Sequence, residues 1–593
     1  MPGLSSLSAD RRLLFFAGKG GTGKTTCAAA MALRLADAGS RVLAISLDPA
    51  HSLRDVLGPA PGFDVLELDA AAEFGAFLRE HRGDLTTVAD RGTYLDEEDI
   101  QALLDLSLPG LDEIAGLLKL GSLASESTYA HVIVDLPPTG HTLRLFDVSA
   151  TFDQLVRALD LMQAKHRFAV SSLTRRYAED GIDRFLDELQ ARCRAAAAAL
   201  TATETSAFYL VARPEPMVMA ETNRLAARLE ALGAPIAALI VNAASTLEPR
   251  EVPRELRELP CVRVPHLAQP PVGTDGLRAV LQGQVTRVPP RSCSLEDGGS
   301  LRPLLARPAR LTIFGGKGGV GKTTMAAATA IGLARQEPGR SVVLLSIDPA
   351  HSLGDAFGQR FGPEAATVKG VRNLQAIEPD PKRQWAELRE HWAGGAQELF
   401  GGASGSRWDP VYDRQIGEQL AQVEPTGLDE LAGATTVIDL LDADTQRLVV
   451  VDSAPTGHLL RFLESPALVV EWSRQLMHLL LKYDLASRVR DLSEELLALS
   501  RKAKRLQGLL REEDTCELVV VTLPEPAVLA ETDRLIGRLR ALALPVRHVV
   551  LNQVASADDV DSVRQRWPAI ELLRVTRRER PIQGTADLEA LTS

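Results

Sequence analysis

The sequence predicts an α/β fold with two doubly wound, mostly parallel sheets. Short apolar and β-branched runs, such as RVLAISL, HVIVDLP and AALIVNA, alternate with stretches of helical periodicity. Continuous apolar runs are typical of strands buried on both faces, as in a parallel sheet that helices cover. The chain has 593 residues, more than one core needs, and its first half recurs in its second. Two such sheets are therefore expected.

The repeat consists of several blocks that recur in one order. LAISLDPAHSLRD returns as LLSIDPAHSLGD, which pairs Asp48 with Asp348. VIVDLPPTGHTLRLF returns as VVVDSAPTGHLLRFL, which pairs Asp135 with Asp452. A common order with slowly changing spacing indicates duplication and fusion.

The repeat also sets the predicted domain boundaries. We place a first half over 1–285 and a second half over 310–593, joined by a linker over 286–309 that is rich in Pro, Gly, Ser and charged residues. Long stretches with apolar residues at helical spacing come after the VIVDLPPTGHTLRLF block and after its repeat, at about 150–200 and 463–513. We expect them to form a helical layer beside each sheet, and most of their apolar residues to be core.

Composition limits the classes of function. The formal net charge of −12 does not predict a nucleic-acid-binding protein. The sequence has no run of about eighteen apolar residues that would form a spanning helix. Five cysteines lie far apart, which argues against a disulfide framework and a paired-cysteine zinc site: Cys27, Cys193, Cys261, Cys293 and Cys516. We expect a cytoplasmic protein, monomeric as a chain, without a nucleic-acid partner.

Two phosphate-binding loops are the strongest signal. Residues 18–25 and 316–323 both fit the G-x-x-x-x-G-K-[ST] pattern, after an apolar strand and before an Ala-rich helix. Glycines let backbone N–H groups approach phosphate oxygens, and the helix N-terminus adds positive charge. The expected nucleotide-binding positions are Gly18, Gly20, Gly21, Thr22, Gly23, Thr25, Thr26, Gly316, Gly318, Gly319, Val320, Gly321, Thr323 and Thr324.

The polar residues of these loops have expected roles with ATP and Mg²⁺. Lys24 and Lys322 are expected to neutralise the β- and γ-phosphates, and Thr25 and Thr323 to bind Mg²⁺.

Each loop carries an extra lysine directly after its first glycine, Lys19 and Lys317. The pattern resembles the deviant Walker A loop, GKGGxGKTT, of ATPases that work as facing pairs. This resemblance implies that each signature lysine, as we call Lys19 and Lys317, reaches the nucleotide of the other half and stabilises the charge that develops during phosphoryl transfer. The alternative is that both lysines are simply solvated.

The DPAHSL motifs at 48–53 and 348–353 and the PTGH motifs at 138–141 and 455–458 resemble switch I and switch II of the ArsA family. That family includes arsenite-pump ATPases and the eukaryotic ATPases that target tail-anchored membrane proteins. The resemblance covers nearly the whole chain and implies a pseudo-dimer of P-loop ATPase halves.

The resemblance implies roles for four aspartates. Asp48 and Asp348 would orient or deprotonate the attacking water. Asp135 and Asp452 follow apolar strands, as Walker B acids do, and would hold Mg²⁺ through its waters. The alternative reading is that these aspartates cap helices or turns.

Asn242 and Asn552 follow the strands ALIV and HVVL, where the family uses an asparagine to read adenine. An asparagine at a strand end is also a common turn residue, so both readings stay open. The switch histidines, such as His51 and His141, could be switch or structural residues and are not predicted to bind metal.

The use of the ATP energy has two open readings, and we favour the first, an efflux pump. A third, a partitioning or positioning ATPase of the ParA/MinD sort that shares the deviant loop, lacks support because no basic patch is evident. The tandem arrangement favours the soluble subunit of an arsenite or antimonite efflux pump, with a membrane permease as partner. The stretches 108–120 and 424–436, where the pump ATPases carry thiolates for arsenic, contain no cysteine. The PG-x-DE pattern of the first stretch is closer to the targeting ATPases, whose partner is a membrane-insertion receptor. Either role implies peripheral association with a membrane.

Overall fold

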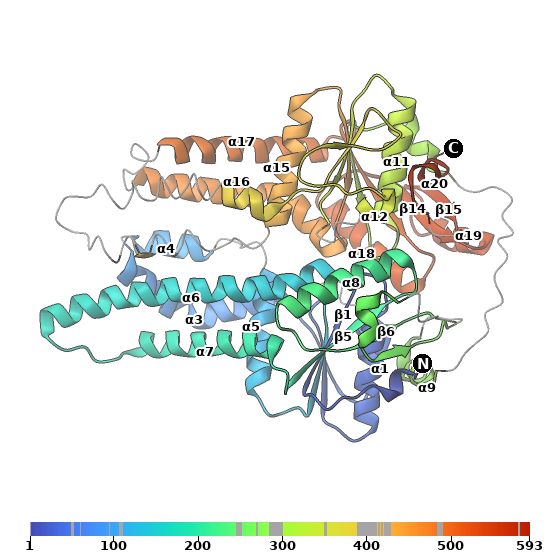
Figure 1. The fold of residues 1–593 in the computed structure, drawn as a ribbon. Helices are drawn as coiled ribbons and strands as arrows, with labels where there is room; N and C mark the ends of the chain where they lie inside the picture. Colours follow the sequence, from blue (N-terminus) through green and yellow to red (C-terminus); the bar gives the residue numbers. More distant parts are fainter. Residues whose placement is uncertain are drawn as a thin grey trace.

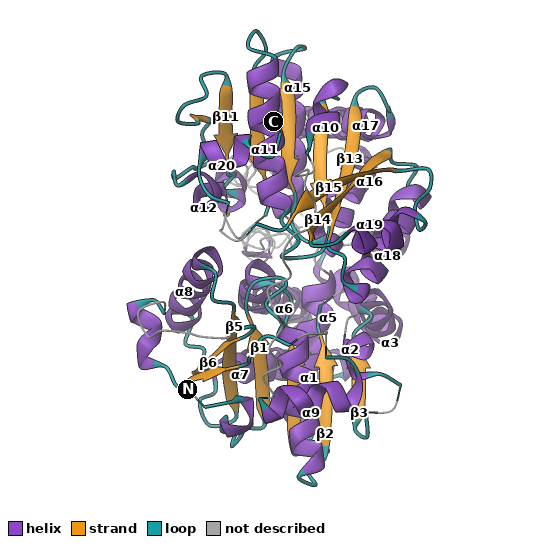
Figure 2. Ribbon diagram, turned by 90° about the vertical axis from the view of Figure 1, so that its right-hand side faces the viewer, coloured by secondary structure: helices purple, strands orange, loops and turns teal. Residues whose placement is uncertain are grey.

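The computed structural model contains two α/β halves that lie one above the other, and their helical layers extend to the same side (Figures 1 and 2). The structure describes residues 2–48, 53–59, 61–93, 95–105, 111–244, 252–267, 271–283, 300–348, 353–387, 412, 415–416, 419, 428–482, 490–578 and 582–592.

The first half contains a seven-stranded parallel sheet in the order β3-β2-β4-β1-β5-β6-β7. The strands are β1 (Leu13–Ala17), β2 (Val42–Ser46), β3 (Asp64–Glu67), β4 (His131–Asp135), β5 (Ser206–Ala212), β6 (Ile236–Val241) and β7 (Cys261–Arg263). The helices are η1 (Leu4–Ser6), α1 (Lys24–Asp37), α2 (Leu53–Leu57), α3 (Ala70–Gly92), α4 (Glu97–Leu104), α5 (Leu111–Ser125), α6 (Thr139–Thr174), α7 (Gly181–Thr201), α8 (Pro216–Ala231), η3 (Arg254–Glu258) and α9 (Gly273–Gln282).

The second half contains an eight-stranded sheet in the order β10-β11-β9-β12-β8-β13-β14-β15, in which β10 alone is antiparallel to its neighbour. The strands are β8 (Leu311–Gly315), β9 (Val342–Ser346), β10 (Ala366–Thr367), β11 (Leu374–Ile377), β12 (Leu448–Asp452), β13 (Cys516–Thr522), β14 (Val546–Val554) and β15 (Glu571–Thr576). The helices are α10 (Arg302–Ala306), α11 (Lys322–Gln336), α12 (Leu353–Phe357), α15 (Leu428–Ala443), α16 (Thr456–Lys482), α17 (Arg490–Arg511), α18 (Pro526–Ala541), α19 (Ala557–Arg564) and α20 (Thr585–Glu589).

The predicted α/β fold is therefore confirmed. The central strands β1 and β8 are buried at every position, as continuous apolar runs in a covered parallel sheet require. Phe15 of β1 stacks on Phe208 of the neighbouring β5, with ring centroids 4.6 Å apart. Small alanines let the helices α1 and α11 pack closely against the sheets.

The helical layers differ from the predicted stretches at their ends. Helix α6 begins at Thr139, directly after the first PTGH proline, and continues to Thr174. In the second half α16 begins at Thr456 and α17 ends at Arg511. Part of the predicted linker forms α10, whose Leu304 and Leu305 are buried.

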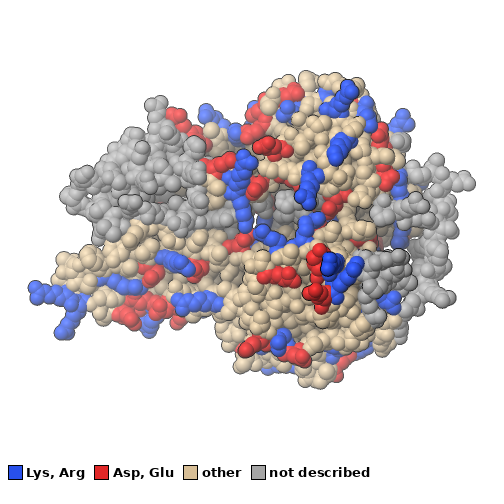
Figure 3. Space-filling model, in the orientation of Figure 1, with Lys and Arg blue, Asp and Glu red and all other residues tan. Residues whose placement is uncertain are grey.

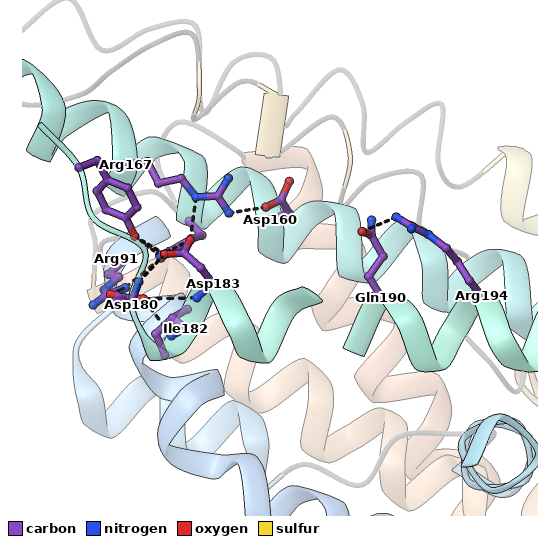
Figure 4. Close-up of polar contacts among 10 residues, drawn as sticks. Arg91, Asp160, Arg167, Asp180, Ile182, Asp183, Gln190 and Arg194 are labelled. Atoms are coloured by element: carbon purple, nitrogen blue, oxygen red, sulfur yellow. Dashed lines mark hydrogen bonds and ion pairs between the residues drawn. The ribbon is translucent and has the colours of Figure 1, made fainter. Parts of the chain in front are cut away.

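The turn between α6 and α7 is held by a polar network far from the sheet (Figure 4). Asp183 accepts a 2.9 Å hydrogen bond from Arg167, and Asp180 pairs with Arg91 of α3 at 2.7 Å. Burial would raise the pKa of Asp183, but hydrogen bonds from Tyr177 and other neighbours lower it to about 2. The network therefore fixes the end of the helix pair.

The described surface has mixed charge. On the face that Figure 3 shows, basic and acidic side chains are interspersed over both halves. No helix in the part of the chain that the structure describes has the length and apolar character needed to cross a bilayer.

Candidate active site

The two phosphate loops lie at the carboxyl ends of β1 and β8, where ligands bind in open parallel sheets. Gly18 lies so close to β5 that a Cβ would come within 2.1 Å of the Val211 carbonyl oxygen. Gly23 has a φ of 90° and is followed directly by helix α1. The backbone of this loop therefore requires glycine, and its shape leaves the first N–H groups of α1 available for an anion.

The loop lysines Lys24 and Lys322 are buried within their own loops. They are 5% and 6% exposed, and their Nζ atoms lie 3.3 and 3.2 Å from the carbonyl oxygens of Lys19 and Lys317. Burial lowers the pKa of Lys24, and the carboxylates of Asp48 and Asp135 oppose this shift. A buried cation beside a glycine-lined loop suits the negative charge of a triphosphate.

Each half also holds a threonine and an aspartate where Mg²⁺ is expected. The Thr25 hydroxyl donates a 2.8 Å hydrogen bond to Asp135 Oδ2, while the buried Oδ1 has no hydrogen-bond partner. Asp452 Oδ1 is in the same state. Burial, the largest influence, raises the pKa of each aspartate to about 7. A hydroxyl and an unsatisfied carboxylate oxygen are ligands that fit Mg²⁺.

Asp48 and Asp348 follow β2 and β9. These strands lie next to β4 and β12, which end at the Walker B aspartates Asp135 and Asp452. All four aspartates therefore lie at the carboxyl ends of their strands. The Asp48 and Asp348 N–H groups donate to Ser46 and Ser346 Oγ at 3.3 and 3.4 Å. Each aspartate acts electrostatically on the loop lysine and the Walker B aspartate of its own half. The remaining residues of both DPAHS segments, including His51, lie outside the described residues.

The signature lysines lie between the two halves. Lys19 Nζ is 2.7 Å from Glu221 Oε2, and Lys317 Nζ is 3.0 Å from Glu531 Oε2. Lys317 lowers the pKa of Lys24 in the other half, and Lys19 has the same effect on Lys322. Each signature lysine is thus close enough to act electrostatically on the opposite loop, and its contact with the nucleotide of the other half stays a prediction.

The two loops themselves are in contact. A Cβ on Gly20 would come within 2.5 Å of Gly318 Cα, and one on Gly319 within 2.5 Å of the Gly20 carbonyl oxygen. Glycine at these positions therefore allows the loops to pack backbone against backbone.

Asn242, directly after β6, and Asn552, within β14, anchor the two phosphate loops. Their Nδ2 atoms donate 2.8 Å hydrogen bonds to the carbonyl oxygens of Thr22 and Val320. The residue after each asparagine has a left-handed backbone, with φ of 55° at Ala243 and 57° at Gln553. This support of the loop is a function that sequence reasoning missed, and adenine recognition stays a prediction.

A cluster of charged side chains also joins the halves, and its two arginines lie on the helices that begin in the switch II motifs. Arg144 of α6 donates to Glu430 of α15 at 3.3 Å, and Arg461 of α16 donates to Glu113 of α5 at 3.3 Å. His458 Nδ1 lies 3.0 Å from the same Glu430 oxygen. Both arginines come three residues after a PTGH histidine, a repeated signal that could have identified them.

The described cysteines are dispersed. Cys27, Cys193 and Cys516 are buried, and burial raises the pKa of each thiol to about 12. Among the residues that the structure describes, no group of three His, Cys, Asp or Glu side chains could hold a metal ion. The buried thiols do not form the set of thiolates that trivalent arsenic prefers.

Comparison with known proteins places these features in a family. Residues 11–253 and 309–580 each match the anion-transporting ATPase family. Over 93% of its length the chain is 28% identical to the ATPase ARSA1 of Chlamydomonas reinhardtii, covering 80% of that protein. It is 28% identical to the "Putative arsenical pump-driving ATPase" of Halobacterium salinarum, over 78% of this chain and 75% of that one. A 43% share of the chain is 32% identical to the ATPase GET3 of Phaeosphaeria nodorum, covering 80% of it.

The two matched segments contain both phosphate loops and all four site aspartates, with one loop and two aspartates in each half. The chain belongs to the anion-transporting ATPase family, as a tandem member with two copies of the ATPase fold.

Proposed function

We propose that the chain hydrolyses ATP at two sites and couples closure of its halves to its helical layer, which shields a hydrophobic segment of a client protein. The observation that carries the two-site part is the position of each signature lysine. Lys317 acts electrostatically on Lys24 and Asp135, and Lys19 acts on Lys322 and Asp452. This placement supports two sites that each use a lysine of the opposite half.

The residues of the first site have distinct roles in this proposal. Lys24 and the α1 N-terminus bind the triphosphate, and Asp48 orients and deprotonates the attacking water. Thr25 and Asp135 hold Mg²⁺, which supplies positive charge to the phosphate oxygens. Lys317 stabilises the charge that develops on the transferred phosphoryl group.

The second site is built from the corresponding residues, with Lys322 in the loop and Asp348 as the base. Thr323 and Asp452 hold its metal, and Lys19 reaches it from the first half. We infer that both sites turn over.

The helical layer supports a hydrophobic client. Of the five exposed large apolar side chains among the described residues, four lie on the helices of this layer: Phe168, Leu173, Leu481 and Leu497. Exposed apolar side chains favour contact with other apolar groups. A client segment would cover them, and a membrane-insertion receptor would then receive it at the membrane surface.

The second candidate is the soluble subunit of an arsenite or antimonite efflux pump that binds a membrane permease. The tandem arrangement favours it, because the Halobacterium salinarum relative aligns over 78% of this chain. The buried, dispersed thiols Cys27, Cys193 and Cys516 disfavour a thiolate metalloid site among the described residues.

One titration tests both candidates. The rate of ATP hydrolysis is measured against increasing arsenite, antimonite and a twenty-residue apolar peptide, with a scrambled polar peptide as the control. Stimulation by the apolar peptide alone is the expected result. Stimulation by either metalloid without an effect of the peptide would overturn the client proposal in favour of the pump.

A further inference from the structure

Helices α8 and α18 carry the same short pattern, Glu-Thr-x-Arg, in the two halves. It reads Glu221 to Arg224 in α8 and Glu531 to Arg534 in α18. Residues three apart on a helix lie on the same face. The glutamate and the arginine of each helix can therefore act together.

The glutamate of α8 holds a lysine that faces the second site. Glu221 is 2% exposed, and its Oε2 lies 2.7 Å from Lys19 Nζ. Lys19 in turn acts electrostatically on Lys322 and Asp452. The carboxylate belongs to the first half, yet the lysine that it holds acts on the nucleotide site of the second.

The arginine of α8 contacts the second half directly. Arg224 Nη2 donates a 2.8 Å hydrogen bond to Asp355 Oδ2. Asp355 lies in α12, the short helix that follows Asp348 and the rest of switch I in the second half. Arg224 and the lysine that Glu221 holds therefore both act on the second site, while Glu221 itself also acts electrostatically on Lys24 of the first.

Helix α18 repeats the arrangement in reverse. Glu531 is 4% exposed and lies 3.0 Å from Lys317, the lysine that acts on Lys24. Arg534 lies 3.5 Å from Asp55 of α2, which follows switch I of the first half. The relation between the two helices is thus reciprocal.

We propose that α8 is a positioning element for the second catalytic site and α18 for the first: the buried glutamate orients the signature lysine, and the arginine holds the switch I helix of the other half. A lysine side chain has four rotatable bonds and many conformers, so a fixed carboxylate beside it restricts where the ammonium group can lie. The arginine contact then places the signature lysine and the switch I helix of the other half at the same site when the halves close.

This inference rests on the proposed two-site ATPase, and the test separates the two. The background variants Asp48→Asn and Asp348→Asn each leave one site with its catalytic carboxylate. If the double variant Asp48→Asn/Asp348→Asn still hydrolyses ATP, the site assignment itself is wrong. If it is inactive and each single variant keeps turnover, the positioning role can be tested.

The test variant is Glu221→Gln, which keeps the side-chain shape and removes the charge. With Asp48→Asn it should lower kcat by about tenfold and leave KM for ATP little changed, because the second loop still binds the nucleotide. With Asp348→Asn it should change kcat by less than about twofold, because the first site uses Glu531. Glu230→Gln, an exposed change on the same helix, is the matched control.

Two outcomes would overturn the proposal. One is an equal loss in both backgrounds, or a loss at the first site alone, since a purely local role for Glu221 gives either result. The other comes from Arg224 and Asp355, whose side chains are 47% and 22% exposed, so we expect the fold to survive substitution there. Arg224→Asp should slow the second site, and Arg224→Asp with Asp355→Arg should restore it; absence of restoration would contradict the contact.

Discussion

Gly20 of the first phosphate loop and Gly318 of the second lie backbone against backbone. A Cβ on Gly20 would come within 2.5 Å of Gly318 Cα, and the reverse substitution would bring a Cβ within 2.7 Å of Gly20 Cα. Atoms do not approach this closely without a shift of the backbone. The two loops can therefore take their facing positions only while both residues are glycine.

We predict that Gly20→Ala keeps the loops apart and slows ATP hydrolysis by about a hundredfold, because a displacement of about 1 Å at a catalytic group has an effect of that size. Binding of a fluorescent ATP analogue should be largely retained, since each loop is complete without the other. Gly508→Ala, near the C-terminal end of α17, is the control, because a Cβ there has no neighbour within 4 Å. Equal turnover in Gly20→Ala and Gly508→Ala would contradict the facing arrangement.

The loop lysines provide a second prediction. Lys24→Ala should silence the first site and Lys322→Ala the second, because the triphosphate charge is then unbalanced at a buried position. The double variant should have no turnover in a phosphate-release assay. Its melting temperature should stay close to that of the unchanged chain, which shows that the fold is intact. Turnover in a folded double variant would refute the assignment of both sites.

The sequence allowed prediction of the fold and of the phosphate loops, since local features determine them. Glycine spacing, apolar runs and the helix after each loop act within a few residues. The side-chain contacts between the two halves were not predicted. The contacts of Arg144 with Glu430 and of Arg224 with Asp355 join residues 286 and 131 positions apart. Such pairing depends on how the two sheets stack, and single-sequence patterns do not report it.

The roles of Glu221 and Asn242 were missed for a related reason. The sequence around Glu221 recurs around Glu531, but the partner Lys19 belongs to a loop about 200 positions earlier, and nothing local indicates an ion pair. Asn242 reads locally as a turn residue, and its hydrogen bond to Thr22 exists only because β6 ends beside the loop. Both residues recur in the second half, but only the fold shows which side chain or loop each of them contacts.

The charged cluster between the halves predicts acid sensitivity. Burial would raise the pKa of Glu430, but Arg144 and His458 outweigh it and lower the pKa to about 2, below the usual 4.5. A depressed pKa contributes stability that is fully present above about pH 4.5 and is lost as the pH falls toward about 2. Glu430→Gln should therefore flatten the dependence of melting temperature on pH over this window.

At neutral pH the same substitution should lower the free energy of unfolding by roughly 3–5 kcal/mol, the usual effect of removing one partner of a buried pair. Chemical denaturation measures this, and the exposed change Glu204→Gln is the control. An unchanged pH profile in Glu430→Gln would mean that the cross-half pair does not form in solution.

The last prediction concerns the client. Leu173 and Leu481 are 86% and 65% exposed, at the ends of α6 and α16, so replacing them with serine should change the free energy of unfolding by less than about 0.5 kcal/mol. Covering a leucine side chain contributes roughly 1.5–3 kcal/mol. Leu173→Ser/Leu481→Ser should thus raise the apolar peptide concentration that gives half-maximal ATPase stimulation by at least about tenfold. Val272→Ser removes another exposed apolar side chain, 57% exposed and outside the helical layer, and stimulation of this variant should be unchanged. A peptide response that is identical in both variants would place the client somewhere other than these helix ends, because the two leucines would then contribute nothing to its binding.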